Sequence, residues 1–169
     1  MNKHILGCNI DFRSYENTAD AVKSELENGL LLSALCEKTG VEPSTFQNWV
    51  KRGYLSKPNG KKYTGEQAAE VIFLNNMKNA VSLDEAAQLL RNTKEKSGVA
   101  VSEILSVLAS SLVRATRFNS TDGESLKSVI NIELRSLGID NGEVSKLIFV
   151  TALSALCADY KQKAQDEIK

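Results

Sequence analysis

Four polar side chains in the first half of the chain have the types and the spacing to contact a nucleic acid. They follow one another at i, i+3, i+4 and i+7, which places them on one face of a helix; this polar row is Ser44, Gln47, Asn48 and Lys51. The amides of Gln and Asn can each pair with two atoms of an adenine edge, and Lys can reach guanine or a phosphate. The row therefore predicts a helix face that reads base edges.

The segment from Pro43 to Arg52, which carries the polar row, is predicted to be a short helix. Its other side holds Phe46, Trp49 and Val50, whose spacing indicates a face packed in the core. A further short helix is expected from Leu31 to Lys38 and ends at Gly40. Two short helices joined by a glycine turn predict a helix-turn-helix.

A basic segment, defined here as Tyr54 to Tyr63, follows the polar-faced helix. It is expected to form two short strands around Asn59-Gly60, a strong hairpin signal. Between Pro43 and Gly65 the chain has no acidic residue and five basic ones: Lys51, Arg52, Lys57, Lys61 and Lys62. Since the whole chain has a net charge of zero, these residues predict a local positive field on the elements that would touch a phosphate backbone.

The remaining sequence predicts a mainly α protein. Capping boxes at Thr64-Gln67 and Ser82-Glu85 predict the starts of two helices, and Lys94 to Gly98 is predicted to be a linker. The expected organisation is an N-terminal arm over residues 1–17, a winged helix-turn-helix domain over residues 18–95, and a helical C-terminal domain over residues 99–169. The first helix of the predicted domain over residues 18–95 is expected to start at Thr18 and to end near Asn28-Gly29.

The C-terminal third is expected to form a three-helix bundle that serves dimerisation or ligand sensing. Its last helix, for which Asp140 and Glu143 are the predicted caps, contains the stretch LIFVTALSALCADY. This stretch is apolar on most sides, which leaves open a central core helix and a subunit interface. A small-molecule effector is a further hypothesis, and an apolar cavity would support it among Leu105, Leu108, Ile130, Leu134, Ile148 and Leu156.

Composition argues against several other classes of protein. Cys8, Cys36 and Cys157 are odd in number and form no Cys-x-x-Cys pair, so neither a disulfide framework nor a zinc site is indicated, and a reduced cytosolic compartment is expected. No apolar run reaches the ~20 residues of a membrane span. His4 has no second histidine to work with, and no phosphate loop or nucleophile motif occurs. The chain is therefore not expected to be an enzyme or to hold a cofactor or metal.

The stretch GVEPSTFQNWVKRGYLSKPNGKKYTGEQAAEVIFLNNMKNAVSLDEAAQLL resembles the N-terminal domain of MerR-type transcription regulators. The shared features are the Gly-Val turn, the hydrophobic Phe46, the aromatic Trp49, the Lys-Arg-Gly before Leu55 and a basic wing that ends in Tyr63. The chain is most similar to an uncharacterised bacterial family of MerR-like proteins, a domain of unknown function. The resemblance covers roughly residues 30–90, and the C-terminal third lies outside it.

This resemblance implies a role for individual residues. Gln47, Asn48 and Lys51 would face the major groove, Trp49 would pack beside the sugar-phosphate backbone, and Lys61, Lys62 and Tyr63 would form the wing contact. From spacing alone, however, Trp49 is expected in the core. MerR-type helices usually have Arg where this chain has Gln47, and an aromatic residue where it has Asn48.

The leading hypothesis is a DNA-binding transcription regulator that works as a homodimer on double-stranded DNA. In this hypothesis Gln47, Asn48 and Lys51 read base edges, while Arg52, Lys57, Lys61 and Lys62 hold phosphates. The other residues of the predicted DNA-binding set are Ser44, Thr45, Trp49 and Tyr63. The alternative is a protein-interaction module that kept the scaffold without binding DNA. Zero net charge and Gln47 in place of Arg motivate this alternative.

Overall fold

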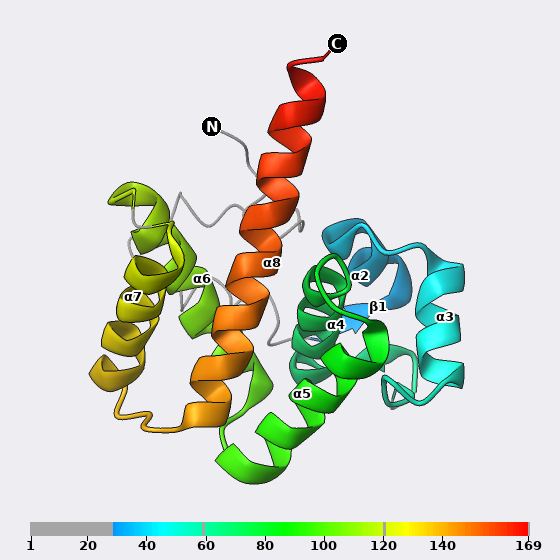
Figure 1. Ribbon diagram of the computed structural model, residues 1–169. Helices are drawn as coiled ribbons and strands as arrows, with labels where there is room; N and C mark the ends of the chain where they lie inside the picture. The colour runs from blue at the N-terminus through cyan, green and yellow to red at the C-terminus, as the bar shows by residue number, and fades with distance from the viewer. Residues whose placement is uncertain (1–28, 59, 120, 169) are drawn as a thin grey trace.

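The computed structural model describes residues 29–58, 60–119 and 121–168, and within them the protein is mainly α (Figure 1). Seven helices accompany a small two-stranded antiparallel sheet near the N-terminal end of the described chain. The bounds are β1 Leu30–Leu31, α2 Leu32–Thr39, α3 Pro43–Lys51, β2 Lys62–Tyr63, α4 Gly65–Met77, α5 Leu83–Ser97, α6 Val101–Arg117, α7 Gly123–Ser136 and α8 Gly142–Asp166. The predicted arm over residues 1–17 and the predicted helix from Thr18 to Asn28 lie outside the described residues.

The two predicted capping boxes are confirmed. The Thr64 side chain accepts from the backbone N–H of Gln67 while the Gln67 side chain accepts from the N–H of Thr64, and Ser82 and Glu85 make the same reciprocal pair at the start of α5. The predicted caps of the last helix were wrong. Asn141 caps α8, because its side-chain oxygen accepts from two backbone N–H groups in the first turn of that helix.

The predicted hairpin within the basic segment was also wrong. Among the residues of this segment that the structure describes, only Lys62–Tyr63 forms a strand, and it pairs with Leu30–Leu31, about thirty residues earlier. Pro58 lacks the N–H that a second strand would need for its ladder. The earlier strand approaches closely: Gly29 has φ +62°, and a Cβ on it would lie 2.8 Å from the carbonyl oxygen of Tyr63. Glycine is therefore required where the strands meet.

The stretch predicted as a linker is mostly helical, which corrects the expectation. The α5 helix runs to Ser97, and Gly98 ends it in the left-handed conformation at φ 65°. The buried carboxylate of Glu70 on α4 pairs with the Lys94 ammonium, so Lys94 is tied to the core. A partly buried ion pair in this place helps α5 to continue through the predicted break.

One hydrophobic core runs through the described molecule and crosses the predicted domain boundary. Nine of the thirteen residues of α4 are buried, because α2, α5, α6 and α8 all pack against it. The three helices predicted for the C-terminal third are present as α6, α7 and α8; they pack on one another, and α6 and α8 also pack on α4. Helix α2 thus packs on α4, and α3 packs on α2.

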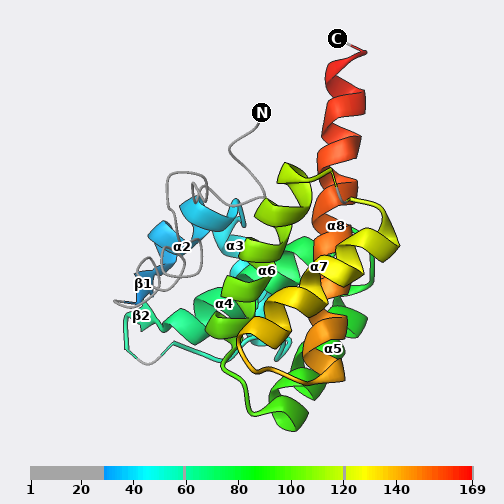
Figure 2. The same ribbon diagram turned by 90° about the vertical axis from the view of Figure 1, so that its left-hand side faces the viewer.

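The longest helix, α8, lies along one side of the molecule and extends past the other helices at its C-terminal end (Figures 1 and 2). Among the described residues, no single helix is both long and apolar enough to cross a membrane. Together α5 and α6 meet that test by length and composition, but they are bent by 111° at their junction.

Candidate nucleic-acid interface

The two faces of α3 have opposite environments, as the sequence predicted. Phe46 is fully buried and Trp49 is 3% exposed. All four residues of the polar row are exposed: Ser44, Gln47, Asn48 and Lys51. Thr45, between the two faces, is half-buried. Four hydrogen-bonding side chains therefore project from α3 into solvent in one line, and the core fixes the rotation of the helix beneath them.

The turn between α2 and α3 is fixed by polar contacts that sequence reasoning missed. The Thr39 hydroxyl donates to the Leu35 carbonyl at 2.7 Å and accepts from the N–H of Val41 at 3.4 Å. The Asn75 amide on α4 donates to the Thr39 carbonyl at 2.9 Å. The available signal was Asn75 itself, a polar residue in an otherwise apolar helical row. These bonds satisfy the orphan carbonyls at the end of α2 and set the angle at which α3 leaves the turn.

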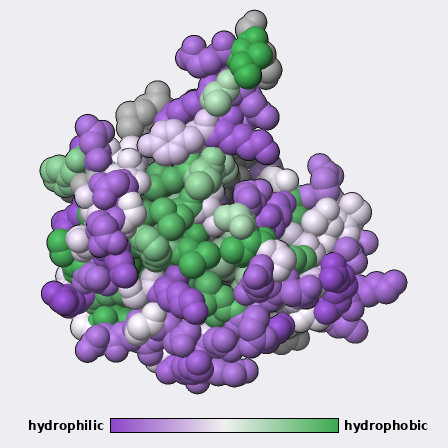
Figure 3. Space-filling model, viewed as in Figure 1, coloured by the Kyte–Doolittle hydropathy of each residue, from purple (hydrophilic) through white to green (hydrophobic). Residues whose placement is uncertain are grey.

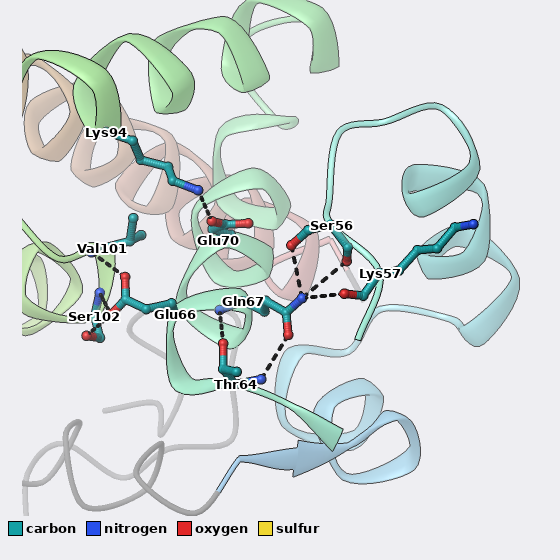
Figure 4. Close-up of polar contacts among 9 residues, drawn as sticks. All are labelled: Ser56, Lys57, Thr64, Glu66, Gln67, Glu70, Lys94, Val101 and Ser102. Atoms are coloured by element: carbon teal, nitrogen blue, oxygen red, sulfur yellow. Dashed lines mark hydrogen bonds and ion pairs between the residues drawn. The ribbon is translucent and has the colours of Figure 1, made fainter. Parts of the chain in front are cut away.

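A single side chain, Gln67 at the start of α4, ties down the basic segment (Figure 4). Its amide nitrogen lies 2.9 Å from the Ser56 hydroxyl and 2.9 Å from the Lys57 carbonyl. Its amide oxygen accepts from the N–H of Thr64 at 3.0 Å, the contact that the capping box predicted. The donations to Ser56 and Lys57 were not predicted. They replace the partner strand of the expected hairpin, since they satisfy backbone groups that a ladder would have used.

At the beginning of the basic segment, Tyr54 links α3 to α5. Its hydroxyl donates to the Asp84 carboxylate at 2.5 Å, and the Arg52 guanidinium carbon lies 4.7 Å from the centre of its ring. The hydrogen bond to Asp84 raises the pKa of the Tyr54 hydroxyl. Arg52 is therefore held against an aromatic ring at the C-terminal end of α3, next to the polar row.

Two acidic residues close to the basic segment are engaged by other helices. The Glu66 carboxylate accepts from the N–H of Val101 at 2.7 Å and from Ser102 at the start of α6, and Glu70 pairs with Lys94 on α5. Figure 4 shows the Glu66 carboxylate directed toward Val101 and Ser102, and the Glu70 carboxylate bonded to Lys94. Glu66 supplies the cap that α6 lacks, because the residue before α6 is Ala100 and makes no side-chain cap.

The cations of this surface are exposed: Lys51, Arg52, Lys57, Lys61 and Lys62. Within the part of the chain that the structure describes, Lys51, Arg52, Lys57 and Lys61 form no salt bridge. Glu66 and Glu70 are engaged by α6 and α5, whereas two other carboxylates lie at the edge of this surface: Glu42 directly precedes α3, and Asp84 accepts from Tyr54. The positive field predicted from composition is thus not cancelled by Glu66 or Glu70, the first two acidic residues after the segment.

Two residues of the predicted contact set have side chains that the core holds. Trp49 is 3% exposed and lies under the Lys78 ammonium, which is 5.6 Å from the ring centre. Tyr63 is 7% exposed and stacks edge-on against Phe46 with 4.8 Å between ring centres. Burial raises the pKa of the Tyr63 hydroxyl and lowers that of Lys78. The contacts that the resemblance implied for the Trp49 and Tyr63 rings would thus need those rings to leave the core, and here they position their neighbours.

Within the described residues, no group of three His, Cys, Asp or Glu side chains is arranged to hold a metal ion. Cys36 is half-buried, and burial raises the pKa of its thiol. The residues proposed to line an effector site belong to the hydrophobic core, with Leu156 at its edge. An effector site among them stays a prediction.

Comparison with known families was made over the whole sequence. Residues 16–107, which are 92 of the 169 residues, match the model of a domain of unknown function, DUF1836. The chain belongs to this family. The matched region runs from before β1 to the first half of α6, so it includes α3, the basic segment and the helices that support them. No curated protein and no solved structure matches the chain.

Proposed function

We propose that this DUF1836 protein is a DNA-binding transcription regulator whose residues 30–90 form a MerR-like winged helix-turn-helix. In this proposal α2 and α3 are the helix pair, α3 lies in the major groove, and the basic segment is the wing. Gln47, Asn48 and Lys51 read base edges. Arg52, Lys57, Lys61 and Lys62 hold phosphates on either side.

The observation that carries the proposal is the exposed polar row beside five exposed cations. An ordinary surface helix mixes both signs of charge, whereas α3 and the basic segment present lysine, arginine and amides without an acid between Pro43 and Gly65. The nearby carboxylates of Glu66 and Glu70 are used to cap α6 and to pair with Lys94. A duplex would therefore meet a positive surface with hydrogen-bonding groups at its centre.

The expected strength of binding follows from the number of cations. The five cations of one protomer, Lys51 at the base edges included, all displace counterions from the duplex and predict a slope of about −4.5 per protomer for log affinity against log salt. Between about 50 and about 200 mM salt, that slope corresponds to a loss of about 500-fold in affinity. A single domain of this size buries little DNA surface, so useful affinity requires two protomers on two half-sites about one helical turn apart.

The test is a titration of fluorescent random duplex DNA at these two salt concentrations. The Lys61→Ala/Lys62→Ala variant removes two of the five cations, so its affinity should fall by only about 40-fold over the same salt range. Its affinity at the lower salt should be reduced for every sequence alike, because phosphate contacts carry no sequence information.

The matched control is Arg117→Ala/Arg135→Ala. It removes the same net charge from exposed positions on α6 and α7, away from α3. Its affinity and salt dependence should equal those of the wild type. Wild-type protein that fails to bind random DNA at the lower salt contradicts the proposal and leaves the protein-interaction module. Equal losses in both variants would show that net charge, and not this surface, governs binding.

A further inference from the structure

The face of α8 opposite its buried residues is apolar and only partly covered, since Phe149, Val150, Leu153 and Leu156 pack at the edge of the core. The core face of the helix is made by Val144, Leu147, Ile148, Thr151, Ala152, Ser154 and Ala155, all buried. The opposite face carries a row that we name the α8 stripe, and its members are Phe149, Val150, Leu153, Leu156, Cys157 and Tyr160. None of these six is buried, and Tyr160 is 55% exposed. Figure 3 shows apolar side chains gathered over α8, with hydrophilic surface around them.

The part of α8 after Ala155 has few contacts with the other helices: Leu156 packs at the edge of the core, and the Tyr160 hydroxyl lies 3.3 Å from the Thr121 hydroxyl. No described residue after Ala155 is buried, although the helix continues to Asp166. The free part is about 16 Å long, and isolated helices shorter than about 12–15 residues are marginal in water. Its internal pairs are Asp159 with Lys163 at 2.6 Å and Gln162 with Asp166 at 2.9 Å. Such pairs contribute only about 0.2–0.5 kcal/mol each, so this end needs another surface to pack on.

We propose that the α8 stripe is the interface at which two copies of this chain pair, with their α8 helices antiparallel. The charges at the two ends of the stripe favour this partner and this direction. Lys146 precedes the stripe, whereas Glu167 follows it on the same side of the helix. Antiparallel pairing brings Lys146 of one copy to Glu167 of the other, while parallel pairing would oppose like charges.

Antiparallel pairing also places apolar residues of the two copies opposite one another. With Lys146 opposite Glu167 of the other copy, Leu153 lies opposite Tyr160 and Leu156 lies opposite Cys157. The two-fold axis then passes close to Cys157, and the free end of each α8 lies on the body of the other copy, where it gains the support it lacks.

The size of the surface suits a modest dimer. From Lys146 to Glu167 the stripe is about 32 Å long, and a helix with its side chains is about 10 Å wide. Pairing would hide several hundred Å² on each copy, close to the lower limit of about 1,200 Å² in total for specific interfaces. The α3 helix lies on a different side of the molecule from the stripe (Figures 1 and 2), so pairing leaves the polar row exposed. The interface supplies the pairing that the proposed function needs, but it does not depend on DNA binding.

The decisive experiment is a charge exchange measured by sedimentation equilibrium without DNA. Lys146→Glu and Glu167→Lys should each weaken the dimer about tenfold, because the two-fold axis repeats every change and attraction becomes repulsion. The double variant Lys146→Glu/Glu167→Lys should restore wild-type association. The two positions lie about 32 Å apart on one helix, so rescue can come only from contact between copies.

A monomeric wild type at all concentrations up to about 100 µM overturns the proposal, and so does a double variant as weak as the single ones. Both results leave DNA binding by a single domain to be judged separately.

Two further variants test the register. Leu153→Arg, at a half-buried position in the middle of the stripe, should abolish association while the circular dichroism and melting temperature stay near those of the wild type. In a Cys8→Ser/Cys36→Ser background, a short bis-maleimide should link Cys157 to Cys157 of the other copy, and Leu153→Arg should prevent the link. Association without a Cys157 link contradicts the antiparallel register.

Discussion

Helices α3 and α8 both bury one face in the core, and they differ in the side chains that the other face presents to solvent. The core side of α3 is anchored by Phe46 and Trp49, and its outer face carries amides and a lysine. The core side of α8 is just as well packed, but its outer face carries Leu153, Leu156 and neighbouring apolar residues. The same packing rule thus leaves a hydrogen-bonding surface on one helix and an apolar surface on the other.

This difference separates two kinds of partner. Exposed amides beside cations gain little from another protein's apolar surface, but they match the acceptors and charges of a duplex. Removing an exposed apolar row from water lowers the free energy, and packing against another protein surface removes the row from water. The molecule therefore carries two surfaces with separate chemistry, and substitutions on α3 should leave self-association in the absence of DNA unaffected.

The largest expected effect is on the inner face of α3. Phe46→Ala removes a fully buried ring that stacks on Tyr63, and it should lower the free energy of unfolding by about 3–5 kcal/mol. Its neighbour on the outer face provides the control, since Gln47→Ala should change stability by less than about 0.5 kcal/mol. Urea denaturation followed by circular dichroism measures both, and equal losses would contradict the assignment of the two faces.

A second prediction concerns the outer faces of α3 and α8. Lys51→Ala should lower affinity for duplex DNA about tenfold, because it removes both a charge and a hydrogen-bond donor from the polar row. It should leave the self-association constant unchanged. Parallel DNA titration and sedimentation measure the two quantities, and a change in both would mean that the two surfaces are not independent.

A smaller effect is expected from the residue that positions the basic segment. Gln67→Ala removes the donations to Ser56 and Lys57, so DNA affinity should fall by a few-fold, about 3- to 5-fold, through loss of order in that segment. The salt slope should stay the same, because the number of cations is unchanged. Thr64→Ala is the control: it disrupts the cap of α4 and leaves those donations in place. An altered slope for Gln67→Ala would contradict a positioning role.

The smallest effect is a dependence of stability on acid pH. Hydrogen bonds from Ser82 lower the pKa of Glu85, and those from Ser125 lower that of Asp122, below the ordinary values of 4.5 and 3.8. Because the folded pKa is the lower one, these caps stabilise the protein at neutral pH, and their contribution is lost as the pH falls through the folded pKa values. Glu85→Gln and Asp122→Asn should flatten the decrease in melting temperature below about pH 4.5.

An equal decrease in the wild type and both variants would assign the acid sensitivity to other carboxylates. The helices α5 and α7, which these residues cap, support α4 and α8 and not the polar row directly. DNA binding near neutral pH should therefore be unchanged in both variants.

What the sequence predicted well was local. The faces of α3 follow from a spacing of three and four residues, and the boxes at Thr64 and Ser82 are complete within four residues. The contacts that the sequence did not predict join residues that lie far apart along the chain. Tyr63 pairs with Leu30 and not with the near side of the basic segment, and Glu66 caps a helix 35 residues later. In the sequence, Glu66 directly follows the stretch without acidic residues and looks like a charged surface residue. Its role as a cap depends on the fold, which brings the start of α6 beside it.

Hydrogen exchange of the full chain with and without a random DNA duplex at low salt tests the central claim most directly, because it reports which backbone amides the duplex protects. The account predicts slower exchange for residues 43–52 and 60–63 and unchanged exchange for α7. Protection confined to α6, α7 and α8, or no protection anywhere, would contradict it.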